Sequence, residues 1–230
     1  MANHPKPYKA IIFDCDGVIL DSNKLKSKAF FLSALKFGEE EALELKNYHI
    51  SHGGISRQEK FKFFLTNIYA SKNYNEDYHF LLAEYAAQVK SGLLECVVNE
   101  NLFNLNELLA NHDKLVISGG SEEELNEVFI KRELHHFFNK GIYGNPKSKK
   151  DIFHNLMQQG LIGIPAIYIG DSKYDWEVAT AFGIDFLFYS PWTELLNWKE
   201  FCIHNNINYF HDFEQLKNFI IMPNKNESCL

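Results

Sequence analysis

Four short apolar runs, separated by amphipathic segments, constrain the fold more than any other feature of this sequence. They are residues 10–13 (AIIF), 114–118 (KLVIS), 166–170 (AIYIG) and 185–190 (DFLFYS). Continuous apolar strands of this length are typical of a parallel sheet that is covered on both faces. Helical patterns occur at 121–132, 149–159 and 173–182, and a shorter strand is expected at 141–144. This alternation predicts an α/β fold built on a doubly wound parallel sheet.

The segment 23–95 interrupts the alternation, because it contains helical patterns and no strand of the same kind. The patterns lie at 25–37, 56–70 and 76–93. A helical insert of this size after the first strand predicts a separate cap, and 230 residues suffice for a core domain and a smaller inserted one. We therefore expect a Rossmann-like core domain formed by 1–22 and 96–230, and an inserted α-helical cap domain formed by 23–95.

Composition narrows the class of partner. The net charge is −7 and only two residues are arginine, which disfavours a nucleic-acid partner. The four cysteines lie far apart and form no C-x-x-C pair, which argues against a disulfide framework or a zinc site. The first nine residues lack the apolar region of a signal peptide, and no apolar stretch approaches the roughly 20 residues of a membrane span. We expect a cytoplasmic protein, monomeric or homodimeric, that contacts no membrane and binds a small substrate.

Acidic residues follow the apolar strands at three points. Asp14 and Asp16 come directly after the first strand in IIFDCDGVILDS, and Asp171 and Asp175 follow a later one in IYIGDSKYD. Ser118 ends the second strand in VISGGS. Ligand sites in open α/β sheets lie outside the carboxyl ends of the strands, so these side chains are expected to converge. Four acids in a small site need a cation, and a hard divalent ion with oxygen ligands, Mg²⁺, is the expected cofactor.

These segments together resemble the four motifs of the haloacid dehalogenase (HAD) superfamily. The motifs are DCDGVILDS, VISGGS, a downstream lysine and GDSKYD, and their order and spacing cover residues 9 to 190. The insert after the first motif resembles the helical cap of the branch that includes phosphoglycolate phosphatase and β-phosphoglucomutase. The resemblance implies a Mg²⁺-dependent phosphatase, a phosphoric monoester hydrolase that cleaves a small phosphorylated metabolite through an aspartyl-phosphate. A sugar phosphate or a phosphoglycolate-like ester would be its substrate.

The resemblance also implies roles for the acids. Asp14 would be the nucleophile and a metal ligand; a carboxylate, with a reference pKa of about 3.9, needs no base to activate it. Asp16 would hold a proton as general acid and then act as base, while its backbone carbonyl binds the metal. Asp171 would bind the metal directly, and Asp175 would do so through water or orient the lysine. An acid at position 16 favours phosphate esters over alkyl halides, whose leaving group needs no proton.

The second motif would bind the phosphoryl oxygens. Ser118 would donate its hydroxyl and Gly119 its amide. The following SEEE (121–124) predicts a capping box with Ser121 as N-cap and Glu124 as its partner. A helix that begins there would favour an anion at its N-terminus.

The third motif requires a lysine beside the nucleophile, and the segment GNPKSKKDIF offers Lys147, Lys149 and Lys150. Many relatives carry Lys-Pro at this point, whereas Pro146 comes earlier here. The start of a helix near residue 151 favours Lys149 as the catalytic lysine, with Lys147 as the second choice. In the expected cap, Arg57 resembles the arginine that related enzymes direct at the core site, and it would bind a distal anionic group of the substrate; it could equally be a surface residue.

Three alternatives remain open at this point. One is a β-phosphoglucomutase-like phosphomutase, which the sequence disfavours because Lys26 stands where relatives of that mutase carry a histidine. Another is a non-enzymatic phospho-receiver, which would be about half as long and lack the helical insert. The last is a catalytically idle binding protein, which would be expected to have lost at least one motif residue.

Overall fold

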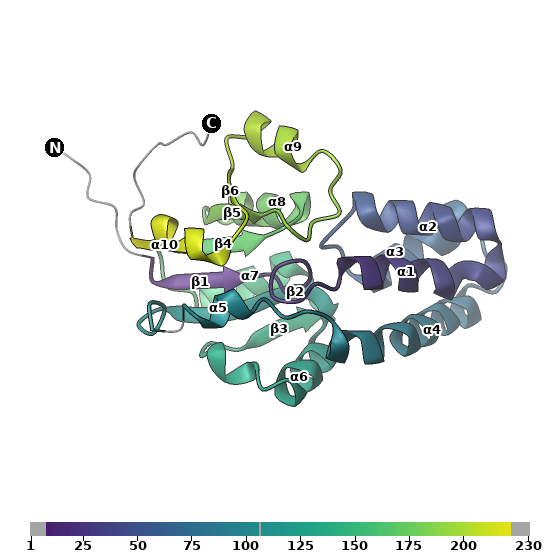
Figure 1. The fold of residues 1–230 in the computed structure, drawn as a ribbon. Helices are drawn as coiled ribbons and strands as arrows, with labels where there is room; N and C mark the ends of the chain where they lie inside the picture. The colour runs from purple at the N-terminus through teal and green to yellow at the C-terminus, as the bar shows by residue number, and fades with distance from the viewer. Residues whose placement is uncertain (1–7, 106, 222–230) are drawn as a thin grey trace.

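The computed structural model describes residues 8–105 and 107–221, and within them the chain forms one sheet of six parallel strands (Figure 1). The strand order is β3-β2-β1-β4-β5-β6. The central strand β1 therefore lies between β2 and β4, and the longest connection, from β1 to β2, contains the segment 23–95. The strands are β1 Ala10–Phe13, β2 Asp113–Ser121, β3 Ile142–Asn145, β4 Ala166–Gly170, β5 Asp185–Tyr189 and β6 Asn208–Phe210.

Helices cover both faces of the sheet, which explains why its strands are apolar on both sides. On one face, Ile12 packs in the same cluster as Phe153 of α7 and Val178 of α8. On the other face, Phe13 packs in a cluster with Phe129 of α6 and with side chains of α5 and α10. The helical elements outside the segment 23–95 are α5 Glu100–Phe103, α6 Glu122–Lys131, the short turn η3 His135–Phe137, α7 Lys149–Gln158, α8 Lys173–Ala181, α9 Trp198–His204 and α10 Phe213–Ile221.

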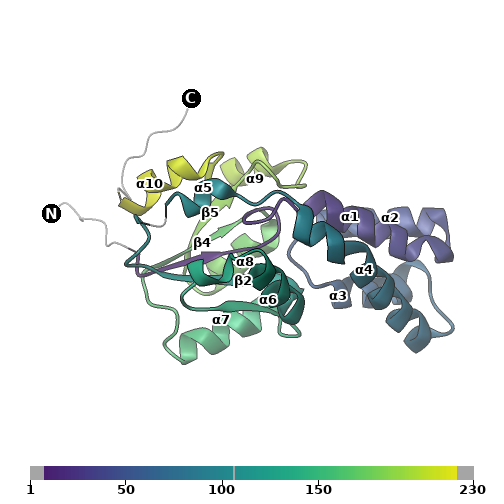
Figure 2. The ribbon, with the colours of Figure 1, turned by 60° about the horizontal axis from the view of Figure 1, so that its bottom comes forward.

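The segment 23–95 forms a helical body beyond the carboxyl ends of the strands, to the right in Figure 1 and again in Figure 2. We call it the cap. Its interior is aromatic, and Phe30, Phe61 and Tyr85 are almost fully buried against one another. Its elements are α1 Asn23–Ala34, η1 Leu35–Phe37, α2 Glu39–Ser51, α3 Arg57–Phe63, η2 Phe64–Ile68 and α4 Tyr74–Glu95.

The α/β fold class with a doubly wound sheet is confirmed. The division into a core of 1–22 and 96–230 and a cap domain of 23–95 stays a prediction, and residues 1–7, 106 and 222–230 of that core lie outside the described residues. The structure adds β6, which the sequence analysis does not anticipate because a three-residue strand carries little pattern. It also extends β2 to Ser121, with an irregular register between Ile117 and Ser121. Ser118 therefore lies within the irregular end of the strand rather than after it.

Candidate active site

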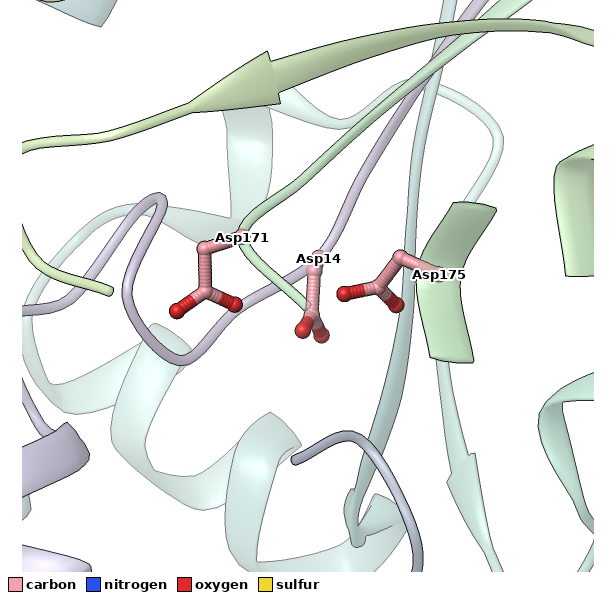
Figure 3. Close-up of side chains that lie close together, drawn as sticks. All are labelled: Asp14, Asp171 and Asp175. Atoms are coloured by element: carbon pink, nitrogen blue, oxygen red, sulfur yellow. The ribbon is translucent and has the colours of Figure 1, made fainter. Parts of the chain in front are cut away.

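Three of the predicted acids meet at the carboxyl edge of the sheet. Asp14 follows β1 and Asp171 follows the neighbouring strand β4, while Asp175 lies in the first turn of α8. One carboxylate oxygen from each of the three lies within 4.8 Å of the others. Figure 3 shows Asp14 between Asp171 and Asp175, with the side chains of Asp14 and Asp171 pointing the same way and the Asp175 carboxylate turned toward Asp14. The topology thus brings residues 157 positions apart in sequence into one cluster.

Lys149 is the lysine that reaches this cluster. Its Nζ lies 3.0 Å from Asp14 Oδ2 and 2.6 Å from Asp175 Oδ1, and its side chain is fully buried. The capping box of Ser148 begins α7 and places Lys149 in its first turn. Burial works against the charge of Lys149, but Asp14 and Asp175 outweigh it and raise the pKa of this lysine. Lys147 is exposed, so the geometry favours Lys149 as the partner of Asp14.

The acidic cluster carries more negative charge than Lys149 can neutralise. Burial raises the pKa of Asp14 to about 7, and the charges of Asp175 and Asp16 add to this effect while Lys149 opposes it. Burial, followed by the charges of Asp14 and Asp175, also raises the pKa of Asp171. A cation at this point would relieve the mutual repulsion. Buried carboxylate oxygens are also the ligands that Mg²⁺ prefers, so this donor set fits the expected ion.

The partners of the acids separate their roles. Both oxygens of Asp175 are already engaged, Oδ1 by Lys149 and the Tyr168 hydroxyl, and Oδ2 by the Ser172 hydroxyl at 2.6 Å. Asp171 accepts one hydrogen bond through Oδ2, from Asn23 at 2.6 Å. Asp14 accepts a hydrogen bond from the Cys15 amide through Oδ1 at 2.7 Å and contacts Lys149 through Oδ2. Asp171 is thus the least engaged of the three acids, and Asp175, with three side-chain donors, is placed to orient Lys149.

The carboxylate of Asp16 is not part of this cluster. Its carboxylate accepts hydrogen bonds from Lys26 Nζ and Ser22 Oγ, both at 2.6 Å. Burial raises the pKa of Asp16, but the charge and hydrogen bond of Lys26, together with Ser22, outweigh it and lower the pKa below its usual value. The lowered pKa favours the ionised form, whereas the general-acid role expected from the sequence needs a protonated Asp16. The physical reason is Lys26, a buried cation that enters the sequence analysis only as the residue that disfavours a mutase.

Gly17 shows how tightly this loop is packed. Its φ is +74°, and a Cβ at this position would lie 2.2 Å from Asp171 Oδ2 and 2.3 Å from Asn23 Nδ2. Both the backbone conformation and the space therefore require glycine. The glycine of the D-x-D-G segment lets the loop after β1 pass against Asp171.

The second motif presents backbone amides beside the acids. Gly119 and Gly120 line the same cavity as Asp14, while the buried Ser118 hydroxyl accepts a hydrogen bond from the Gly120 amide at 3.1 Å. Helix α6 begins at Glu122 and Ser121 caps it, as expected. The other contact of the predicted capping box, from the Glu124 carboxylate to the Ser121 backbone amide, is wrong, because this carboxylate binds another partner.

That partner is Arg57, the predicted substrate-binding arginine. Its Nη2 lies 2.9 Å from Glu124 Oε2, and its guanidinium carbon lies 5.0 Å from the centre of the Tyr85 ring. Arg57 begins α3 of the cap and Glu124 belongs to α6 of the core, so the ion pair joins the two bodies. Arg57 also lines the cavity, but its charge is already balanced. Its contact with substrate stays a prediction.

A cavity between cap and core contains these groups. It has a water-accessible volume of about 70 Å³ and is lined by Asp14, Asp16 and Asp171 from the core and by aromatic and basic side chains from the cap. Two of its lining residues, His49 and Lys60, were not predicted as site residues. The sequence spacing could have indicated Lys60 as a site residue, because it lies three residues after Arg57 and so shares a face of α3 with it.

Comparison with known proteins places the chain in a family. Residues 11–189 match the model of the haloacid dehalogenase-like hydrolase family. The match covers more than half of the chain, and the protein belongs to this family of hydrolases. No curated protein matches the sequence.

Solved structures share the fold across almost the whole chain. A protein from Clostridium acetobutylicum, described as a predicted phosphatase, is 20% identical, with a TM-score of 0.74 and coverage of 94% of this chain and 99% of that one. A protein from Haemophilus somnus, described as a predicted phosphoglycolate phosphatase, is 14% identical, with a TM-score of 0.69 and the same coverage. A HAD-hydrolase candidate from Bacillus subtilis, bound to magnesium, is 17% identical, with a TM-score of 0.64 and coverage of 94% and 100%. Among the described residues of our chain, none of the helices combines the length and apolar character that crossing a bilayer requires.

Proposed function

We propose that this hydrolase is a Mg²⁺-dependent phosphatase that cleaves a small phosphorylated metabolite through an aspartyl-phosphate on Asp14. The observation that carries the proposal is the position of Asp14, which lines the cavity, contacts Lys149 and lies beside Asp171. Two neighbouring structures described as phosphoglycolate phosphatases support the choice of a small phosphate ester.

The first half of the reaction needs Asp14 as a carboxylate. One of its oxygens would attack phosphorus, and the bond from phosphorus to the substrate oxygen would break. Lys149 would hold Asp14 in its ionised form, and the Gly119 amide and the Ser118 hydroxyl would donate to the phosphoryl oxygens. Mg²⁺, held by Asp14, Asp171 and the Asp16 carbonyl, would supply positive charge that offsets the negative charge of the phosphate group.

The second half releases phosphate. Water would attack the phosphorus of the aspartyl-phosphate, and the bond to Asp14 would break. Asp16 would accept a proton from that water, having given one to the leaving alkoxide in the first half. Its bond to Lys26 in this structure suits the base, since it keeps the carboxylate ionised. The acid form would require Asp16 to give up its contact with Lys26.

The test is release of phosphate from a panel of small esters, including phosphoglycolate and sugar phosphates. We expect turnover with Mg²⁺, loss of turnover with EDTA, and loss in Asp14→Asn. Asp113→Asn is a matched control, because Asp113 lies at the amino end of β2, opposite the site, and its side chain is 36% exposed. Full activity of Asp14→Asn would refute the proposed nucleophile, and full activity in EDTA would refute the metal.

A further inference from the structure

Lys60 is a buried cation that the proposed chemistry does not use. It lies in α3 of the cap, is 1% exposed and lines the cavity that contains Asp14. Among the ion pairs of the described residues, none involves Lys60, so no carboxylate lies within 4.0 Å of its Nζ. Charged groups are rarely buried without a partner, because the loss of hydration is costly.

The other lysine and arginine side chains that the cap contributes to the cavity are already paired. Lys26 is paired with Asp16, and Arg57 is paired with Glu124. The charges that act most strongly on Lys60 are those of Lys26, Asp16, Lys149 and Glu194. The other titratable groups that line the cavity are Asp14, His49, Arg57, Tyr85, Glu124, Asp171 and Lys173. Lys60 is thus the cap cation that has no anionic partner in the described cavity.

His49 holds the side-chain amine of Lys60 in place through a hydrogen bond. Its Nδ1 lies 2.7 Å from Lys60 Nζ, and its ring stacks on Phe30 at 4.3 Å between centroids. Burial, followed by the charges of Lys60 and Lys26, lowers the pKa of His49 and favours the neutral ring. The ammonium form of Lys60 can only donate, so Nδ1 is the acceptor of its bond. An ammonium has three protons to donate, and this contact uses one. Lys60 keeps protons available for a ligand in the cavity.

We infer that Lys60, positioned by His49, binds a second anionic group of the substrate, a carboxylate or a further phosphate, at the end remote from the phosphoryl group that Asp14 attacks. This inference rests on the proposed function, because it assumes that the phosphoryl group lies at Asp14. The arriving anion supplies the partner that Lys60 lacks. Burial and the charge of Lys26 lower the pKa of Lys60 to about 7, so a bound anion also favours protonation of the amine.

Inert phosphonates test the inference by calorimetric titration in the presence of Mg²⁺. The probes are 3-phosphonopropionate, ethane-1,2-bisphosphonate and propylphosphonate, which share a phosphonate and differ in the remote group. We expect the carboxylate or the second phosphonate to improve the dissociation constant by about tenfold or more relative to propylphosphonate. In Lys60→Met we expect this advantage to disappear, while propylphosphonate binds as before. The first two probes also distinguish a carboxylate from a phosphate as the preferred group.

Lys62→Met is the matched control, because Lys62 lies on the same helix with its side chain 51% exposed. It should leave all three affinities unchanged. Lys60→Gln provides a second variant should Lys60→Met fail to fold. The inference is overturned if propylphosphonate binds as tightly as both charged probes, or if the Lys60 variants weaken all three probes equally. If none of the three probes binds, the phosphoryl site at Asp14 is refuted, and both proposals fall.

Discussion

Replacing Lys149 by methionine perturbs the centre of the site in a way that stability measurements can follow. Lys149 is fully buried between Asp14 and Asp175, at 3.0 and 2.6 Å. Methionine keeps the length of the side chain but leaves the acids without their cation. Removing one partner of a buried ion pair costs about 3–5 kcal/mol. For a chain of this size, 1 kcal/mol corresponds to about 2–4 °C, so we expect Lys149→Met to lower the midpoint of thermal unfolding by about 6–20 °C.

The assay is thermal unfolding followed by circular dichroism in metal-free buffer, repeated with Mg²⁺. Mg²⁺ at about 100 times its dissociation constant would restore about 2.7 kcal/mol, because it binds the folded state. Lys147→Met is the control, since Lys147 is exposed two residues away, and its effect should stay within about 0.5 kcal/mol. Equal midpoints for Lys149→Met and the wild type would refute the electrostatic argument. Failure of Mg²⁺ to stabilise either protein would refute the metal site.

Three further predictions concern the cap and its contact with the core. Because burial lowers the pKa of Lys60 to about 7, the unfolded chain binds more protons than the folded one from there to about pH 10.5, so stability should rise with pH in this window. In urea unfolding at pH 6.5, the free energy of unfolding of Lys60→Met should exceed that of the wild type by about a few kcal/mol, and at pH 9.5 by less. The same difference at both pH values would contradict the lowered pKa of Lys60. Glu124→Gln removes the partner of Arg57 and should cost about 1–3 kcal/mol in the same assay, whereas no loss would mean that the pair contributes nothing. Gly119→Ala would place a Cβ 2.5 Å from the Gly54 carbonyl oxygen, so it should lower the free energy of unfolding by about 1–3 kcal/mol and reduce phosphate release. A wild-type free energy of unfolding and a wild-type rate of phosphate release would contradict the expected clash.

Sequence predicts the central part of this site because the chemistry follows the strands. Asp14 and Asp171 come directly after apolar runs, and parallel strands end at one edge of the sheet. Lys149 was favoured from its place just before a helix, and the Ser148 capping box does put it in the first turn of α7. Local patterns of this kind extend over only a few residues, so they can be recognised without knowledge of the rest of the fold.

Contacts between cap and core were not predictable in this way. Glu124 satisfies the local pattern of a capping box, but an arginine 67 positions earlier competes for its carboxylate. Lys60 resembles a surface lysine in sequence, and only the packing of α2, α3 and α4 shows that it is buried in the cavity. The charge state of Asp16 likewise depends on Lys26, ten residues away on another element. Each of these depends on long-range packing rather than on a local pattern.

The most direct test of the account is a search for a phosphoryl group on Asp14. The enzyme is mixed with a substrate found by the phosphate-release screen, quenched in acid during turnover, digested and examined by mass spectrometry. We predict a phosphorylated peptide that contains residues 11–22, with the modification on Asp14 and absent from Asp14→Asn. Turnover with no such peptide, or with the phosphoryl group on another residue, would contradict the assignment of Asp14 as the nucleophile.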